Sequence, residues 1–120
     1  FTYFTSRVAD TAGFHDHQGN TLLDDGQVLT GTVAMPILGR EAKLEALDRA
    51  LGTHGLAREQ AIAMGDGAND LAMIQAAGLG LAVHAKPVVA TASDAAINLT
   101  DLTSALYFQG YSDSQIIWRE

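Results

Sequence analysis

Short apolar runs alternate with helical patterns along most of this chain. The run Ala61 to Met64 is uninterrupted and ends at a Gly-Asp-Gly turn, which predicts a short buried strand. Leu79 to Val83 predicts a second strand of the same kind, and Leu71 to Ala77 predicts a helix between the two. Because strands that alternate with helices are typical of βαβ units, we expect an α/β fold of Rossmann-like type, with a mainly parallel sheet and flanking helices.

The other elements follow from periodic apolar residues and from residues that start or end helices. Leu44, Leu47 and Leu51 form the apolar stripe of an amphipathic helix, and an Asp-Gly pair between two short strands predicts a β-hairpin. The remaining predicted elements are a helix Phe1 to Ala12, hairpin strands Thr21 to Leu23 and Gln27 to Val33 around Asp24-Asp25-Gly26, a helix Arg40 to Leu51 closed by Gly52, a turn Ala57 to Gln60, a helix from Lys86-Pro87 to Ala92, a strand Ala95 to Ile97, and a helix capped by Thr100 or Asp101 that runs to Phe108.

Charge and composition narrow the classes of partner. The net charge is −7, with 14 acidic against 7 basic residues, which argues against nucleic acid because phosphate backbones need a basic surface. No apolar run approaches the roughly 18 residues of a membrane-spanning helix, and the N-terminus lacks the basic region of a signal peptide. Cysteine is absent, so thiol chemistry is excluded within this chain. These features fit a cytoplasmic enzyme.

The turn that follows the Ala61 to Met64 run carries the candidate chemistry. Asp66, Asn69 and Asp70 lie where open α/β folds place their sites, at the carboxyl end of a strand. A carboxylate at such a tip suits a hard cation, and we expect Gly65 and Gly67 to supply backbone angles that other residues avoid and to admit a ligand closely. Gly-Asp-Gly alone is also an ordinary turn, and a carboxylate at position 70 also suits the N-terminus of a helix.

Two lysines and a histidine pair are further candidates. Lys43 lies one turn into the amphipathic helix, where it is either a surface lysine or a phosphate-binding one, and its residue type alone favours the surface. Lys86 is a weaker candidate, for which a structural turn is the simpler interpretation. His15 and His17 flank Asp16, but no further ligand accompanies the pair, so we interpret it as a solvated loop rather than a metal site.

Several of these stretches together resemble one enzyme family. The run Gly-Asp-Gly-Ala-Asn-Asp at 65–70 resembles the fourth motif of the haloacid-dehalogenase-like phosphohydrolases. Its combination with His84-Ala85-Lys86-Pro87, with Asn20-Thr21-Leu22, with Leu29-Thr30-Gly31 and with Arg40-Glu41-Ala42-Lys43 resembles the phosphoserine phosphatases within that superfamily. The resemblance implies that residues 1–110 are the C-terminal part of one such core domain, followed by a tail at 111–120.

The resemblance also implies a reaction and roles. Such enzymes hydrolyse O-phosphoserine to serine and phosphate, in L-serine biosynthesis, with Mg²⁺ and an aspartyl-phosphate. Asp66 would bind Mg²⁺, Asp70 would orient metal-bound water or neighbouring groups, Asn69 would contact the phosphate or substrate, and Lys43 would neutralise the phosphate and the nucleophile. Given this match, Lys43 is expected to be functional. Positioning and charge neutralisation of this kind carry most of the catalysis of phosphoryl transfer.

The chain lacks several features of the family on which the family's chemistry depends. The family's nucleophile belongs to an Asp-x-Asp motif on the first strand, and no Asp-x-Asp pair occurs in these 120 residues. The first strands, the Ser-Gly-Gly motif and the cap that selects serine are absent as well. We therefore expect a piece of a longer phosphatase that is inactive alone and that either is complemented by its N-terminal segment or forms a homo-oligomer. The alternatives are a phosphatase for another small phosphoester and a non-catalytic assembly module.

Overall fold

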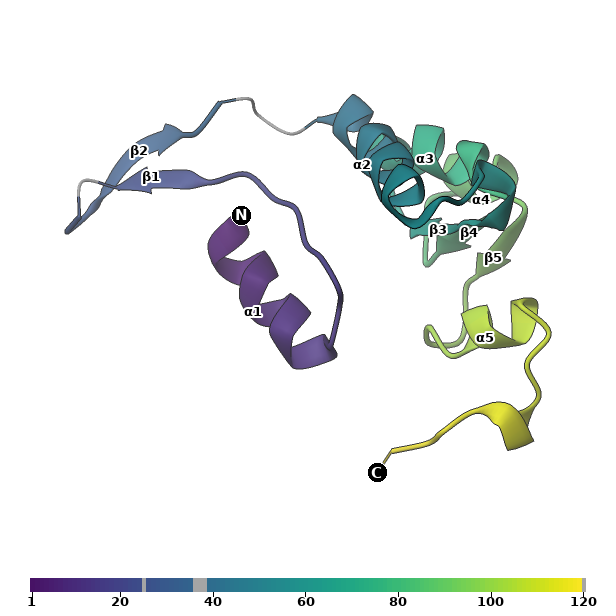
Figure 1. The fold of residues 1–120 in the computed structure, drawn as a ribbon. Helices are drawn as coiled ribbons and strands as arrows, with labels where there is room; N and C mark the ends of the chain where they lie inside the picture. Colours follow the sequence, from purple (N-terminus) through teal and green to yellow (C-terminus); the bar gives the residue numbers. More distant parts are fainter. Residues whose placement is uncertain (25, 36–38, 120) are drawn as a thin grey trace. The chain divides into compact units, whose positions relative to one another are not determined.

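The computed structural model describes residues 1–24, 26–35 and 39–119, which fall into two compact units, residues 1–39 and 40–120 (Figure 1). The expectation that residues 1–110 share one domain stays a prediction.

The first unit is a helix followed by a β-hairpin, as predicted. Helix α1 (Thr2–Ala12) ends at Gly13, whose φ of 75° is left-handed. Strands β1 (Leu22–Asp24) and β2 (Leu29–Val33) pair antiparallel. Asp25 lies outside the described residues. The Gly26 N–H donates a hydrogen bond to the Asp24 carboxylate at 2.8 Å.

The apolar stripe of α1 is largely uncovered within this unit. Phe1, Phe4 and Val8 are 50%, 62% and 59% exposed, and the buried residue of the helix is Ala9. A stripe of three large apolar side chains is more than an isolated exposed residue, so this face is suited to contact a further apolar surface.

The second unit is an α/β unit built on three parallel strands (Figure 1). The strand order is β3-β4-β5, and the parallel pairing of β4 with both neighbours confirms the predicted parallel sheet. The elements are α2 (Arg40–His54), the 3₁₀ turn η1 (Arg58–Gln60), β3 (Ile62–Gly65), the 3₁₀ turn η2 (Ala68–Asp70), α3 (Leu71–Ala76), β4 (Leu79–Val83), α4 (Pro87–Thr91), β5 (Ala95–Ile97), α5 (Ser104–Phe108) and the 3₁₀ turn η3 (Asp113–Gln115).

Each face of this sheet buries its own small core. Ala82 of β4 packs against Ile74 of α3 and Val89 of α4 on one face. Leu81 and Ile97 pack against α5 on the other face. Alternate residues of a strand point to opposite faces, so a strand buried on both faces reads as a continuous apolar run, as β4 does.

Two predicted helix boundaries are wrong. Helix α2 continues past Gly52 to His54 and ends at Gly55, whose φ is 65°. One interior glycine costs a helix only about 1 kcal/mol, which the packing of α2 on α3 offsets. The last helix begins at Ser104 rather than beside Asp101, because the Asp101 carboxylate accepts the Thr103 N–H in a preceding turn.

Strand β3 is an edge of the sheet among the described strands. It pairs with β4 alone, and Ile62 and Met64 are 36% and 41% exposed. Among the described strands, β3 therefore has a neighbour on one side only. The tail is also uncovered, with Ile117 87% and Trp118 59% exposed.

Gly80 offers a test of this packing. A Cβ at Gly80 would lie 2.2 Å from the backbone oxygen of Ile74, whereas a Cβ at Gly52 would meet nothing within 4 Å. Gly80→Ala should lower the free energy of unfolding by about 1–3 kcal/mol or more, because backbone has to move. Gly52→Ala, the matched control, should raise it by about 0.5–1 kcal/mol. Urea unfolding followed by circular dichroism measures both, and equal effects would contradict the assigned packing.

Candidate active site

The loop between β3 and α3 holds three of the predicted site residues. Strand β3 ends at Gly65, and the chain passes through Asp66 into the 3₁₀ turn that precedes α3. Asp66 and Asn69 are exposed, whereas Asp70 is only 4% exposed. The loop therefore presents one carboxylate and one carboxamide to solvent and keeps a second carboxylate inside.

The buried carboxylate of Asp70 organises this loop. One of its oxygens accepts a hydrogen bond from Lys43 Nζ, and the other accepts the N–H groups of Asp66 and Gly67, each at 3.1 Å. Asp70 stands at the N-cap of α3 but makes no side-chain bond to that helix. Its hydrogen bonds point back to the Asp66 turn, so it fixes the turn rather than capping the helix.

The same hydrogen bonds keep Asp70 ionised. Burial alone raises the pKa of Asp70, but the hydrogen bond from Lys43, the N–H donors of Gly67 and Asp66 and the charge of Lys43 outweigh it. The pKa of Asp70 is therefore lowered from its usual value. Near neutral pH the site holds a buried anion bonded to one cation.

The glycines of this loop are needed for space and not for unusual backbone angles, which corrects the expectation from the sequence. Gly67 is extended, with φ −121°, and Gly65 is not among the residues with positive φ. A Cβ at Gly65 would lie 2.4 Å from the Asp70 Cβ, and one at Gly67 would lie 2.6 Å from the Asn69 side-chain oxygen. Gly65 thus makes room for the Asp70 carboxylate, a role that the sequence alone does not reveal.

The structure distinguishes the two candidate lysines. Lys43 reaches from the first turns of α2 to Asp70, 27 positions away in sequence, with its side chain 43% exposed. Lys86 is exposed at the N-cap of α4, in the loop after β4. The ion pair with a buried carboxylate separates Lys43 from an ordinary surface lysine.

Among the side chains of this loop, the Asp66 carboxylate is suited to be one ligand of a Mg²⁺ ion. Mg²⁺ keeps several waters and is held by one or two carboxylates together with substrate phosphate, and the exposed carboxylate of Asp66 suits that role. Within the described part of the chain, no group of three or more His, Cys, Asp or Glu side chains is placed to hold a metal. In the His15 and His17 pair, considered above as a metal site, the His17 ring Nδ1 hydrogen-bonds to the Thr5 hydroxyl at 3.0 Å.

Replacement of Asp70 should alter the pH dependence of stability. A carboxylate whose pKa is lowered by folding stabilises the fold above its unfolded pKa, about 4, and this contribution is lost as the pH falls through the lowered folded pKa. Asp70→Asn should cost about 1–3 kcal/mol of unfolding free energy at pH 7 and much less near pH 2. Urea unfolding at both pH values measures this, with the exposed Glu45→Gln as control. An equal deficit at both pH values would contradict a stabilising ionised Asp70.

The chain also matches known proteins. A family model described as haloacid dehalogenase-like hydrolase matches residues 39–105. The phosphoserine phosphatase of Streptomyces coelicolor is 41% identical over 117 residues, which cover 97% of this chain and 28% of that protein. The phosphoserine phosphatase of Haemophilus influenzae is 37% identical over 114 residues, covering 94% of this chain and 36% of that protein. The chain thus spans well under half of these relatives.

Solved structures agree with these matches. An unliganded probable phosphoserine phosphatase from Vibrio cholerae superposes with a TM-score of 0.84 and 32% identity, over 93% of this chain and 37% of that one. A substrate-bound phosphoserine phosphatase complex superposes with a TM-score of 0.82 and 32% identity, over 90% of this chain and 51% of that one. No helix within the described residues is long and apolar enough to cross a bilayer. The chain belongs to the haloacid dehalogenase-like hydrolases and corresponds to the C-terminal part of their phosphoserine phosphatase members.

Proposed function

We propose that this chain supplies the Lys43, Asp66, Asn69 and Asp70 part of the active site of a cytoplasmic, Mg²⁺-dependent phosphoserine phosphatase. The reaction is hydrolysis of O-phosphoserine to serine and phosphate, a step of L-serine synthesis. The observation that carries the proposal is the ion pair of Lys43 with the buried Asp70, next to exposed Asp66, in a chain 41% identical over 117 residues to a phosphoserine phosphatase. A lysine, a hard oxygen ligand and a fixed loop are what phosphoryl transfer needs from a protein.

Each residue would act through its place in the loop after β3. Lys43 would place positive charge beside the phosphate, and Asp70 would hold that ammonium and the Asp66 turn in one arrangement. Asp66 would hold Mg²⁺, which when bound supplies neutralisation of charge on the phosphate oxygens. The exposed carboxamide of Asn69 would hydrogen-bond the phosphate or the substrate.

The nucleophile must come from outside these 120 residues, because no Asp-x-Asp pair occurs in them. One similar structure is a phospho-aspartyl intermediate analogue of phosphoserine phosphatase, with 32% identity over 90% of this chain. By analogy, an aspartyl-phosphate would form on the missing segment and be hydrolysed beside Lys43.

A chimera tests this function. The matching region of the Streptomyces coelicolor phosphatase is exchanged for this chain, and phosphate release from O-phosphoserine is measured with Mg²⁺. The chimera should be active and the purified 120-residue chain inactive. An inactive but folded chimera would contradict the proposal, as would Mg²⁺-dependent turnover by the chain alone that is lost in Asp66→Ala.

The chimera keeps the relative's other segments, so substrate choice needs a separate test in the protein that naturally contains this chain. A panel of small phosphomonoesters distinguishes a phosphoserine phosphatase from a phosphatase with another substrate. A natural protein in which no Asp-x-Asp motif accompanies this chain would favour the second alternative, a non-catalytic assembly module.

We also propose that the open edge of β3 pairs with another strand. The backbone N–H and C=O groups along one side of β3 pair with no described strand. The side chains of Ile62 and Met64 in this strand are exposed. Such an edge is a template for pairing, either with the segment that relatives carry beyond this match or with a second copy. Light scattering should therefore show association of the isolated chain. A monodisperse monomer with slow amide exchange at residues 62–64 would contradict the proposal.

A further inference from the structure

His84 combines an unusual backbone with two tertiary hydrogen bonds. It is the one non-glycine with a positive φ, 45°, among the residues that the structure describes. This conformation is unfavourable for L-residues, although histidine tolerates it better than most. Such conformations persist where the surrounding structure holds them, so the contacts of His84 are informative.

The two hydrogen bonds of His84 join it to the end of β5 and to the loop that follows β5. Its N–H donates to the Ile97 carbonyl at 2.7 Å, at the end of β5. Its ring Nε2 lies 2.7 Å from the Thr100 carbonyl oxygen. Because a carbonyl only accepts hydrogen bonds, this Nε2 must carry the proton, which in a neutral ring selects the Nε2–H tautomer.

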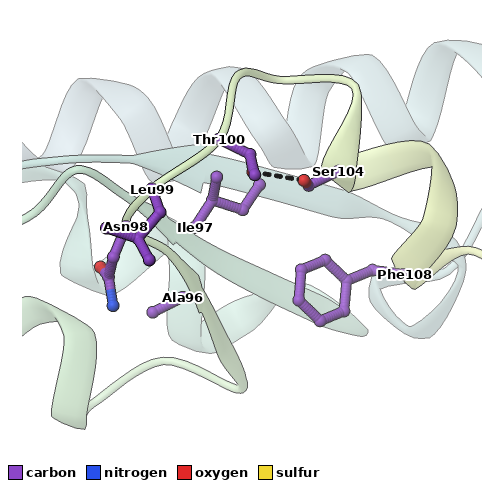
Figure 2. A pocket seen from close by; sticks show the side chains of 7 residues that line it. All are labelled: Ala96, Ile97, Asn98, Leu99, Thr100, Ser104 and Phe108. Atoms are coloured by element: carbon purple, nitrogen blue, oxygen red, sulfur yellow. Dashed lines mark hydrogen bonds between the residues drawn. The ribbon is translucent and has the colours of Figure 1, made fainter.

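Thr100 is held on its other side by α5. Its hydroxyl hydrogen-bonds to the Ser104 hydroxyl (Figure 2). Thr100 and Ser104 line a surface pocket of about 290 Å³ together with Ala96, Ile97, Asn98, Leu99 and Phe108. The loop after β5 is therefore fastened at Thr100 from two directions, by the ring of His84 and by the first turn of α5.

We propose that His84 is a positioning residue that fixes the loop 98–100 and the start of α5 through the Thr100 carbonyl. The left-handed backbone turns the chain after β4, and the ring spans to the neighbouring loop. This accounts for a histidine in the His84-Ala85-Lys86-Pro87 stretch, in which Lys86 and Pro87 start α4. The proposal concerns this chain's own loops and holds whether or not the phosphatase function does.

The ring bond is tested first in the unaltered 120-residue chain. At about pH 8, where a histidine ring is ordinarily neutral, ¹⁵N NMR should show the Nε2–H tautomer for His84 and a ring N–H signal protected from water. His54, at the exposed end of α2, is the internal control and should show no protected ring signal. An Nδ1–H tautomer, or a His84 signal as unprotected as that of His54, would overturn the proposal.

Variants then test what the bond does. H84G keeps the left-handed backbone and removes the ring, so amide exchange at Thr103 to Leu106 should become about two- to tenfold faster while β4 amides are unchanged. H84Q restores an N–H donor on a side chain of similar reach and should recover at least half of the lost protection, and K86A should change nothing. Unchanged exchange in H84G, or no recovery in H84Q, would overturn the proposal. If H84G loses the β4 protection as well, the ring measurement in the unaltered chain decides.

Discussion

Lys43→Ala should reduce phosphoserine hydrolysis by the chimeric phosphatase about 10²- to 10³-fold, the usual cost of removing one preorganised donor from a developing charge. The lysine is held in place by the buried Asp70, so its charge reaches the site without reorganisation. The loss should fall mainly on kcat, because the lysine stabilises the charge of the transferring phosphoryl group more strongly in the transition state than in the bound substrate. Steady-state kinetics at saturating Mg²⁺ measure both parameters.

Lys86→Ala is the matched control for this change. It removes the same charge from the same sheet unit, at the exposed N-cap of α4, and should leave kcat within about threefold, as surface substitutions away from a site do. Equal losses in the two variants would contradict the choice of Lys43. Because Lys43→Ala also removes the partner of Asp70, urea unfolding should accompany the kinetics, and activity should be compared where both variants are folded.

Asp66→Asn should raise the Mg²⁺ concentration for half-maximal activity of the chimera by at least about tenfold, since a neutral carboxamide is a poor substitute for a carboxylate ligand. The fold should be nearly unaffected. The Asp66 side chain is exposed, and its contribution to the loop is a backbone N–H to Asp70, which asparagine retains. Activity over a Mg²⁺ titration, with circular dichroism of the 120-residue chain, separates the two effects.

Glu59→Gln is the control for Asp66. Glu59 is an exposed carboxylate in the turn just before β3, at the opposite end of the strand, so its loss changes net charge equally without touching the loop. It should leave the Mg²⁺ dependence within about twofold, as for an ordinary surface position. Activity of Asp66→Asn within twofold of the parent at limiting Mg²⁺ would refute the metal assignment.

Local pattern was sufficient to locate the strands and α-helices of the second unit, although not the ends of two helices. Strand β4 occupies the predicted Leu79–Val83, and β5 the predicted Ala95–Ile97. A run buried on both faces and bounded by turn residues has few other conformations open to it. The boundaries at Gly52 and Asp101 failed because a helix end depends on which hydrogen bonds compete there, and packing on α3 and the Thr103 N–H decided those.

The amino-acid sequence alone was enough to predict an acidic α/β chain with a Gly-Asp-Gly-Ala-Asn-Asp turn after a buried strand. Through resemblance, it also indicated a phosphohydrolase family. The ion pair of Lys43 with Asp70, 27 positions apart, is visible in the tertiary structure alone. The same is true of the space that Gly65 leaves for Asp70 and of the hydrogen bond from the His84 ring to the Thr100 carbonyl. Periodicity reports which face of an element is buried. Which side chains meet depends on how α2 packs on α3 and on how parallel strands bring their ends to one edge of the sheet. A local sequence pattern does not specify these contacts between elements.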